Sequence, residues 1–419
     1  MTAVRVDAPL DEQLDALLAG RPEALAEPFA LYRVLRERSR VYEHGPMVLL
    51  THYDDVKLVA RDAERFSSRA LVTGSRIEAG RALLSGDALA AFDDVIEFCA
   101  HFPSRADGAE HGRLRGAAHR AFTPARIAAL EETTRQILAG LLASVPVDEQ
   151  VDFMDVAFRL PLLVVAELLG VPHEDADMIH EWSVRLGAAN ASTEGTPYFA
   201  ARDALGEFRT YVDALIDQNR DAPGSDLVSL LMSAYEEEAL TRDELAALFV
   251  QVLFAGHETT TTLIAGGMAE LLKAPDQWRS LGEDPSLIPN AVEELLRLVT
   301  PSQFANRLAV RDDELAGVRI PAGTTLIAVL AAANRDPAVF EEPDRCNIRR
   351  TDLGKQLAFG FGPHFCLGAS LARLEARVVL ETLTRRHPNA ELATDELRWK
   401  GGAMLRALEA LPLRLGAPA

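Results

Sequence analysis

A loop rich in glycine and proline, residues 359–368, constrains the fold of this chain more than any other stretch. It reads Phe-Gly-Phe-Gly-Pro-His-Phe-Cys-Leu-Gly, and apolar residues at helical spacing follow it from 369 to 387. Three glycines and a proline exclude the interior of a helix or strand, so the segment must be a bent loop that holds Cys366 in front of a helix. There, backbone N–H groups and the positive end of the helix favour a thiolate.

A single cysteine held in this way can act as a nucleophile or as the one axial ligand of a haem iron. The plainer alternative is a buried, unreactive cysteine in a tight turn. The rest of the loop favours haem, because glycines leave room for a flat macrocycle and apolar side chains offer it a surface. The residues concerned are Phe359, Gly360, Gly362, Leu367 and Gly368.

A second distinctive element is the helix predicted from Thr241 to Lys273. It begins with a capping box, Thr-Arg-Asp-Glu, and ends just before Pro275, which gives a length of about 50 Å. Its middle, Ala-Gly-His-Glu-Thr-Thr-Thr-Thr from 255 to 262, is a poor helix sequence, since glycine and β-branched threonine lower helix propensity. A local weakness inside a strong helix is typical of a functional position. The alternative is a threonine-rich helix of the core.

Two other binding motifs begin in these segments and are not completed. His257 and Glu258 start a zinc-protease-like string, but Thr261 stands where the second histidine would be needed. Gly360 and Gly362 start a dinucleotide fingerprint, but residue 365, the third glycine position, is phenylalanine. Neither a zinc site nor a Rossmann fold is predicted.

The loop and the helix together resemble the cytochrome P-450 family. Residues 359–368 match its haem-binding signature, Phe-Gly-x-Gly-x-His-x-Cys-x-Gly, at every defining position, and residues 255–260 match its oxygen-activation motif. The resemblance covers nearly the whole chain. It implies a mainly α fold with small β sheets, formed as a single large domain over residues 1–419. It also implies haem b, iron protoporphyrin IX, with an axial thiolate from Cys366.

The resemblance also implies the residues that bind the cofactor. His111 and Arg115 share a face of a predicted helix and match the family's His-x-x-x-Arg propionate site, and Arg307 matches a further propionate-binding arginine. The segment entering this helix departs from the usual Asp-Pro-Pro-Glu-His, because Gly-Ala replaces the two prolines. The implied cofactor-binding residues are His111, Arg115, Ala255, Gly256, Arg307, Phe359, Gly360, His364, Cys366 and Gly368.

For catalysis, the resemblance implies Thr259, Glu258 and the metal ligand Cys366. The hydroxyl of Thr259 can bond toward the carbonyl of Ala255 and open the helix into a groove for dioxygen and water. Glu258 would then relay the protons that cleavage of the O–O bond requires.

A third motif is the pair Glu294 and Arg297, three apart on one helical face. It matches the family's Glu-x-x-Arg pair, which is a structural lock, and Arg345 is expected to join it. Shorter patterns predict a hairpin from strands at 41–43 and 48–51, and a strand–turn–strand from 318–320 and 325–329. Small, polar residues at 188–196 fit the mobile lid that the family places over its pocket.

Composition restricts the partners and the compartment. The 419-residue chain has a net charge of −20, which disfavours nucleic acid and anionic membrane surfaces as partners. Its three cysteines are far apart in sequence, which indicates a reducing compartment without a disulfide framework. Charged residues interrupt the first 30 positions, so neither a signal peptide nor a membrane span is predicted, and a cytoplasmic protein is expected.

The function implied by the resemblance is that of a haem-dependent monooxygenase. Such an enzyme activates O2 with electrons from an external redox partner and hydroxylates or epoxidises a largely apolar small molecule, in secondary metabolism or catabolism. Ferredoxin and ferredoxin reductase are the expected electron donors. The substrate can be free or tethered to a carrier protein, and the sequence does not decide between the two. A basic docking patch is expected from Arg113, Arg349, Arg350, Lys355 and Arg373. The alternatives are a haem-thiolate binding or sensor protein without turnover, and a peroxide-dependent haem enzyme.

Overall fold

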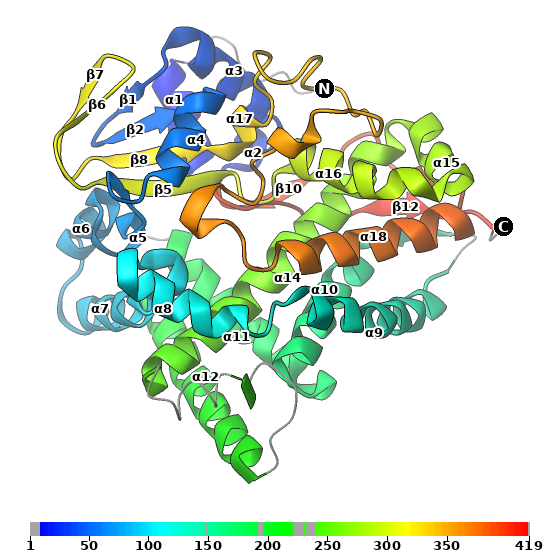
Figure 1. Cartoon of the computed structure of the whole chain (residues 1–419), viewed down its shortest axis with the longest axis horizontal. Helices are drawn as coiled ribbons and strands as arrows, with labels where there is room; N and C mark the ends of the chain where they lie inside the picture. Colours follow the sequence, from blue (N-terminus) through cyan, green and yellow to red (C-terminus); the bar gives the residue numbers. More distant parts are fainter. Residues whose placement is uncertain (1–8, 147–148, 192–195, 222–228, 231–239, 418–419) are drawn as a thin grey trace.

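The computed structural model describes residues 9–146, 149–191, 196–221, 229–230 and 240–417, and it is mainly helical. Its long helices surround one central helix, which crosses the molecule diagonally (Figure 1). The helices are α1 (Leu10–Leu18), α2 (Pro22–Ala26), α3 (Pro28–Arg38), α4 (Tyr53–Arg61), α5 (Ala70–Thr73), α6 (Ser75–Ala82), α7 (Gly86–Ala100), α8 (Gly108–His119), α9 (Pro124–Ala143), α10 (Met154–Leu169), α11 (Ala176–Ala191), α12 (Thr196–Asp221), α14 (Arg242–Leu272), α15 (Pro275–Glu283), α16 (Ile288–Val299), α17 (Leu330–Ala333) and α18 (Ala369–Arg386).

The strands are short and form small sheets, as predicted for the fold class. They are β1 (Tyr42–His44), β2 (Met47–Leu50), β3 (Phe66–Ser67), β4 (Gln150–Asp152), β5 (Phe304–Ala309), β6 (Asp313–Leu315), β7 (Val318–Ile320), β8 (Thr325–Val329), β9 (Glu391–Leu392), β10 (Trp399–Gly401), β11 (Arg406–Leu408) and β12 (Pro412–Arg414). The largest sheet has the order β1-β2-β8-β5-β3 and lies beside the N-terminal helices (Figure 1).

This sheet joins segments that are far apart in the sequence. The predicted hairpin is confirmed, with Tyr42 opposite Leu49 in the antiparallel pair β1 and β2. Strand β2 then pairs with β8 in parallel, and β5 pairs antiparallel with both β8 and β3. The strands predicted at 318–320 and 325–329 are both present, but they belong to different sheets, because β7 pairs with β6.

The central helix α14 is positioned by its cap and by its burial. The predicted capping box is confirmed: the Thr241 hydroxyl accepts from the backbone N–H of Glu244 at 3.3 Å, and the Glu244 carboxylate accepts from that of Thr241 at 2.8 Å. Arg113 of α8 also donates to this carboxylate. Most side chains of α14 are buried against its neighbours, so the helix is a rigid support for its accessible residues.

The buried lock around Glu294 differs from the prediction in one member. Glu294 and Arg297 are both fully buried on α16, and their side chains form two hydrogen bonds of 2.7 and 2.9 Å. The third side chain is Arg350, whose Nε lies 3.2 Å from the Glu294 carboxylate. Arg345 was the wrong choice, because its guanidinium pairs with Glu342 at the surface and only its carbonyl accepts from Arg297.

Two further predictions can be compared only with the described residues. Helix α11 ends at Ala191 and α12 begins at Thr196, so much of the predicted lid at 188–196 lies outside them. Within the described part of the chain, no helix has the length and apolar character that crossing a membrane requires.

Candidate functional site

The loop before α18 is held in shape by two glycines in the left-handed region. Gly360 has φ +70° and Gly362 has φ +82°, which side chains with a Cβ rarely adopt. A Cβ on Gly362 would also lie 2.8 Å from the Cα of Arg61, so α4 packs directly against the loop backbone. The N–H of Cys366 donates to the carbonyl of Phe359 at 2.9 Å and closes the turn. The loop therefore fixes Cys366 directly in front of α18, as predicted.

The thiol of Cys366 is surrounded by protein, although the residue as a whole keeps exposed surface. Burial raises the pKa of its thiol, while the N–H of Gly368 and the nearby charge of Arg115 act in the opposite direction. Part of the surface of Cys366 is nevertheless exposed, so the residue lies at the border between the protein interior and accessible space. The predicted N–H contact at the helix start is present, but in this structure burial outweighs it. A positive metal ion bound at the sulfur would favour the thiolate instead.

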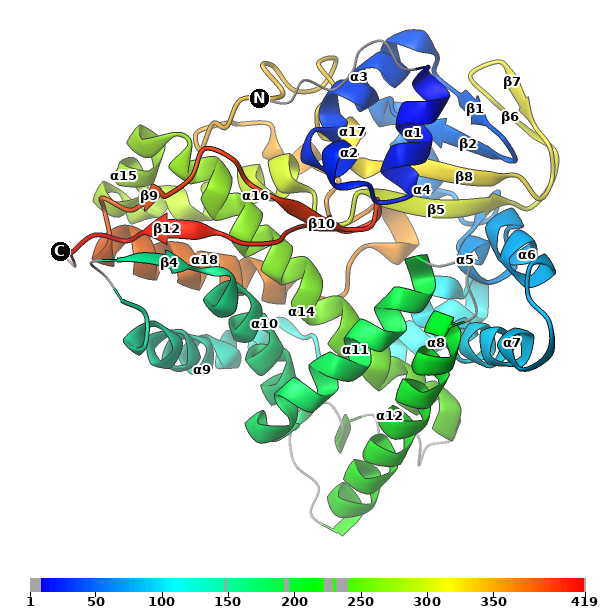
Figure 2. The same ribbon diagram turned by 180° about the vertical axis from the view of Figure 1, so that it is seen from behind.

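The middle of α14 presents an accessible face beside this loop. Helix α18, which begins at the cysteine loop, packs against α14 (Figures 1 and 2). Ala255 is exposed, and Phe254, Glu258 and Thr259 are half-buried, although most of the helix is fully buried. An exposed alanine in the centre of a core helix indicates a hollow next to it. The two predicted motifs thus lie on neighbouring elements, and both keep accessible residues.

Four threonine hydroxyls in sequence bond back to the helix. The predicted bond from Thr259 to the carbonyl of Ala255 is present at 2.8 Å. The next three threonines, Thr260 to Thr262, make the same bond at 2.9 to 3.0 Å. The predicted opening of the helix is absent, since α14 is continuous from Arg242 to Leu272. Of the four threonines, Thr259 alone is partly exposed, because Thr260, Thr261 and Thr262 are buried.

Gly256 has a packing role that the sequence did not reveal. A Cβ at this position would lie 2.9 Å from Cγ2 of Val165, a residue of α10. The glycine is therefore required by the close approach of α10 to α14, whatever its relation to the cofactor. Gly368 is unlike it, because a Cβ there would meet its nearest neighbour, the ring of Phe122, at 3.9 Å.

A cluster of basic side chains lies at one edge of the site. The rings of His111 and His364 stack with centroids 4.1 Å apart, and Nε2 of His364 lies 3.6 Å from Asp107. Burial, together with the charges of His364 and Arg115, lowers the pKa of His111 to about 4. Burial also lowers the pKa of Arg307 to about 10. The charges of His364, Arg115 and Arg307 all lower the pKa of His111, so these four predicted cofactor-binding residues lie close together.

Three polar atoms of this cluster are buried without a hydrogen-bond partner among the described residues: Nε2 of His111, Nε2 of His364 and Nε of Arg307. Buried polar atoms are almost always hydrogen-bonded, so three unpartnered nitrogens in one basic cluster point to a site for an anion. Arg115 donates to the carbonyl of Phe365 at 2.6 Å and thereby ties α8 to the cysteine loop. The carboxylates of a haem bound next to Cys366 fit these donors.

Asp107 is a site residue that sequence reasoning passed over. It accepts from the hydroxyl of Ser67 at 2.5 Å and from the N–H of Ser68 at 3.0 Å. Although burial acts in the opposite direction, the nearby His364 imidazole and the hydrogen bonds from Ser67 and Ser68 lower the pKa of Asp107 to about 2. A charged Asp107 therefore orients His364. Its position four residues before His111 was the available signal.

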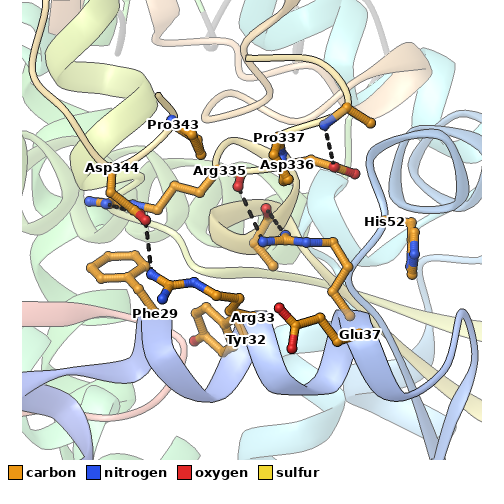
Figure 3. A pocket seen from close by; sticks show the side chains of 13 residues that line it. Phe29, Tyr32, Arg33, Glu37, His52, Arg335, Asp336, Pro337, Pro343 and Asp344 are labelled. Carbon is orange, nitrogen blue, oxygen red and sulfur yellow. Dashed lines mark hydrogen bonds and ion pairs between the residues drawn. The ribbon is translucent and has the colours of Figure 1, made fainter. Parts of the chain in front are cut away.

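A separate hollow of about 510 Å³ lies between α3 and the segment that follows α17 (Figure 3). Three of its charged side chains are paired, since Arg33 and Arg335 both bind Asp344 at 2.9 Å. None of the residues that line it belongs to the basic cluster or to the cysteine loop. It is therefore distinct from the cysteine site.

The basic cluster leads to a prediction about haem retention. Replacing Arg307 by leucine is expected to raise the haem dissociation constant about 10- to 100-fold, because a hydrogen bond to a charged group contributes about 1.5–3 kcal/mol. The measurement is the rate of haem transfer to an excess of a tighter haem-binding protein. Arg319→Leu is the matched control, since Arg319 is exposed on β7. Equal transfer rates for the two variants would contradict the assignment.

A cysteine loop beside a threonine-bearing helix, with cationic donors at one edge, defines a haem-thiolate protein. Comparisons with known proteins agree. A family model described as cytochrome P450 matches residues 200–388. The vitamin D(3) 25-hydroxylase of Pseudonocardia autotrophica is 38% identical over 399 residues, which is 93% of this chain and 94% of the relative. The chain belongs to the cytochrome P450 family.

Other relatives define the activity. The cytochrome P450 monooxygenase PikC of Streptomyces venezuelae is 36% identical over 93% of this chain and 91% of its own length. Among solved structures, P450BioI in complex with an acyl carrier protein ligated to hexadec-9Z-enoic acid superposes with a TM-score of 0.85 and 32% identity, over 93% of this chain and 99% of that one. The protein is a haem-dependent monooxygenase, and its cofactor is haem with a cysteine thiolate.

Proposed function

We propose that this monooxygenase hydroxylates or epoxidises a largely apolar small molecule with O2 and with electrons from an external ferredoxin and its reductase. The observation that carries the proposal is the accessible pair Glu258 and Thr259 on a helix that is otherwise buried. A haem or gas sensor has no need of a proton-delivering pair, and a direct user of hydrogen peroxide receives its protons with the oxidant. We propose that residues 1–419 act as one domain.

The site residues have distinct proposed roles. Cys366 ligates the iron, and the basic cluster of His111, Arg115, Arg307 and His364 holds the propionates. When bound, the haem supplies the electron transfer and the oxygen chemistry. Thr259 offers a hydroxyl at the accessible face of α14, and Glu258 supplies the protons. Burial raises the pKa of Glu258, although the charge of Lys400 opposes it, so the carboxyl can hold a proton at a pH where an exposed glutamate could not.

Names of relatives support an apolar substrate. They include a vitamin D(3) hydroxylase and a structure of a myxobacterial P450 in complex with myristic acid, which is 36% identical with a TM-score of 0.84. An acyl chain tethered to a carrier protein is a second candidate, because P450BioI was solved with such a partner. A screen of free lipids, steroids and macrocycles against the ferric enzyme, with fatty acyl carrier proteins in parallel, separates the two.

The proposed docking patch for the electron donor is smaller than the sequence indicated. Arg350 is buried in the lock around Glu294, so its inclusion was wrong. Arg113 and Arg373 remain partly exposed but pair with Glu244 and Glu293 respectively. Arg349 and Lys355 are exposed, as is Arg113 beside its partner Glu244. We propose that Arg349 and Lys355, near the cysteine loop in sequence, contribute to a weak electrostatic contact with ferredoxin.

The experiment that tests the proposed function compares two routes of turnover. The purified enzyme receives either a ferredoxin system with O2 or hydrogen peroxide alone, and product is measured for each substrate found in the screen. Product formation that depends on ferredoxin and O2 supports the proposal. Turnover with hydrogen peroxide that equals or exceeds it would establish the peroxide-dependent alternative, and binding without any product would establish a sensor.

Replacing Thr259 by alanine is expected to uncouple electron consumption from product. Haem and substrate binding should persist, while product per electron falls roughly tenfold or more and hydrogen peroxide accumulates, because proton delivery is disturbed. Thr260→Val is the control, since Thr260 is buried and its hydroxyl bonds to Gly256. An unchanged yield per electron in Thr259→Ala would rule out the assigned role.

A further inference from the structure

The residue that precedes Glu258 on α14, His257, is fully buried. His257 has no exposed surface, and its Nδ1 lies 2.8 Å from the carbonyl of Leu253. A carbonyl can only accept a hydrogen bond, so Nδ1 carries the proton and Nε2 keeps a free electron pair. Nε2 is buried without a hydrogen-bond partner among the described residues, and it lies 3.9 Å from Oε1 of Glu258. This separation exceeds hydrogen-bond distance, so a transfer between the two atoms requires one of the side chains to move.

A second histidine continues this line toward the surface. His180 of α11 is half-buried, and its ring centroid lies 5.8 Å from that of His257 with the rings at 89°. Its Nδ1 is also buried without a partner in the described structure. Phe158 of α10 packs its ring against both imidazoles, at centroid distances of 4.3 and 5.9 Å, and keeps them in place. Three helices thus hold two histidines edge to face.

Charged groups surround the two ends of this arrangement. Asp177 and Lys400 act on His180, and Lys400 also acts on Glu258. Both residues are exposed, so the outer histidine borders a hydrated, charged surface. The inner end is the half-buried Glu258 carboxyl, next to Thr259 on α14. From the surface inward, the polar groups follow one another as His180, His257 and Glu258, with a gap between His257 and Glu258 that exceeds hydrogen-bond distance.

We propose that His180 and His257 pass protons from solvent to Glu258. In each passage, His180 takes up a proton at the surface and releases one toward Nε2 of His257, and the resulting imidazolium gives that proton to Oε1 of the Glu258 carboxylate. No electrons move and both imidazoles return to neutral, so the net change is one proton carried inward. The inference rests on the proposed function, because Glu258 needs this supply only if it delivers protons during turnover.

The environment gives the transfer a direction. Burial lowers the pKa of His257 to about 4, whereas burial raises the pKa of Glu258. A protonated His257 therefore gives its proton readily to a neighbouring carboxylate. The bond from Nδ1 to the Leu253 carbonyl keeps Nε2 as the exchanging atom, because it fixes the tautomer.

The test uses the holoenzyme with His257→Gln and His180→Leu, each compared with His173→Gln, a control at an exposed histidine before α11. Three quantities are measured: product per electron, the solvent isotope effect on turnover in D2O, and the infrared C=O stretching band of the Glu258 carboxyl in the resting enzyme. We expect both variants to lose roughly tenfold in product per electron and to show an altered isotope effect. The Glu258 band should shift in His257→Gln.

Values like those of the control for either variant would overturn the proposed route. If His257→Gln does not fold, His180→Leu decides alone, because its side chain lies outside α14 and reaches the surface. Glu258→Gln separates this inference from the proposed function. If Glu258→Gln uncouples turnover and the histidine variants do not, the function stands and the route is wrong. If Glu258→Gln also matches the wild type, the role of Glu258 is itself wrong.

Discussion

Replacing Cys366 by histidine is expected to give a protein that retains some haem but forms no product. The absorption spectrum of the reduced, carbon monoxide-bound enzyme should lose the strongly red-shifted Soret band that a thiolate ligand produces. The physical reason is that a neutral imidazole donates less electron density to iron than a thiolate does, and cleavage of the O–O bond depends on that donation.

Cys346→Ser is the matched control for this experiment. Cys346 is half-buried beside the lock around Glu294, and burial raises the pKa of its thiol to about 12. A thiol with that pKa is protonated at neutral pH and cannot compete for the metal. The control should keep both the red-shifted band and its activity. An unchanged spectrum in Cys366→His would mean that another residue ligates the iron.

Replacing Glu294 by alanine is expected to destabilise the protein severely. The Glu294 carboxylate accepts from Arg297, from Arg350 and from the N–H of Asn347 at 2.9 Å, and no part of Glu294 is exposed. Its removal leaves two buried guanidinium groups without a counter-charge, which lowers the free energy of unfolding by about 3–5 kcal/mol. Equilibrium unfolding in urea, followed by circular dichroism, measures this loss.

Two variants give this prediction its controls. Glu342→Ala removes the surface partner of Arg345, where both side chains are more than half exposed, and it should cost about 1 kcal/mol or less. Glu294→Gln keeps the volume and some hydrogen bonds while removing the charge, so its loss should lie between the two. If Glu294→Ala unfolds at the same urea concentration as Glu342→Ala, the buried lock does not support the fold.

The sequence predicted the elements of the site better than their connections. The cysteine loop could be recognised because proline fixes φ and glycine is the residue that readily adopts positive φ, as Gly360 and Gly362 do. The capping box of α14 was likewise a local pattern. In both cases the physical cause acts between residues close in the chain, so the sequence carries it directly.

Connections between distant segments were less predictable. Arg345 and Arg350 are both arginines near the lock, and only the path of the backbone turns Arg350 toward Glu294 and Arg345 toward solvent. The sheet partners of β7 and β8 were hidden for the same reason, because pairing depends on where other segments arrive. The two histidines behind Glu258 lie on different helices, and no spacing in the sequence links residue 180 to residue 257.

The mixed sheet has a consequence for how the chain is made. Strand β2 is complete at residue 50, but its parallel partner β8 ends at residue 329, so a ribosome must add nearly three hundred residues before the pair can form. The contact between Arg115 and the cysteine loop forms later still. Contacts this distant in sequence slow folding and leave early strands unpaired. Haem loading should therefore follow translation, and overexpression should benefit more from slow synthesis and chaperones than from added haem alone.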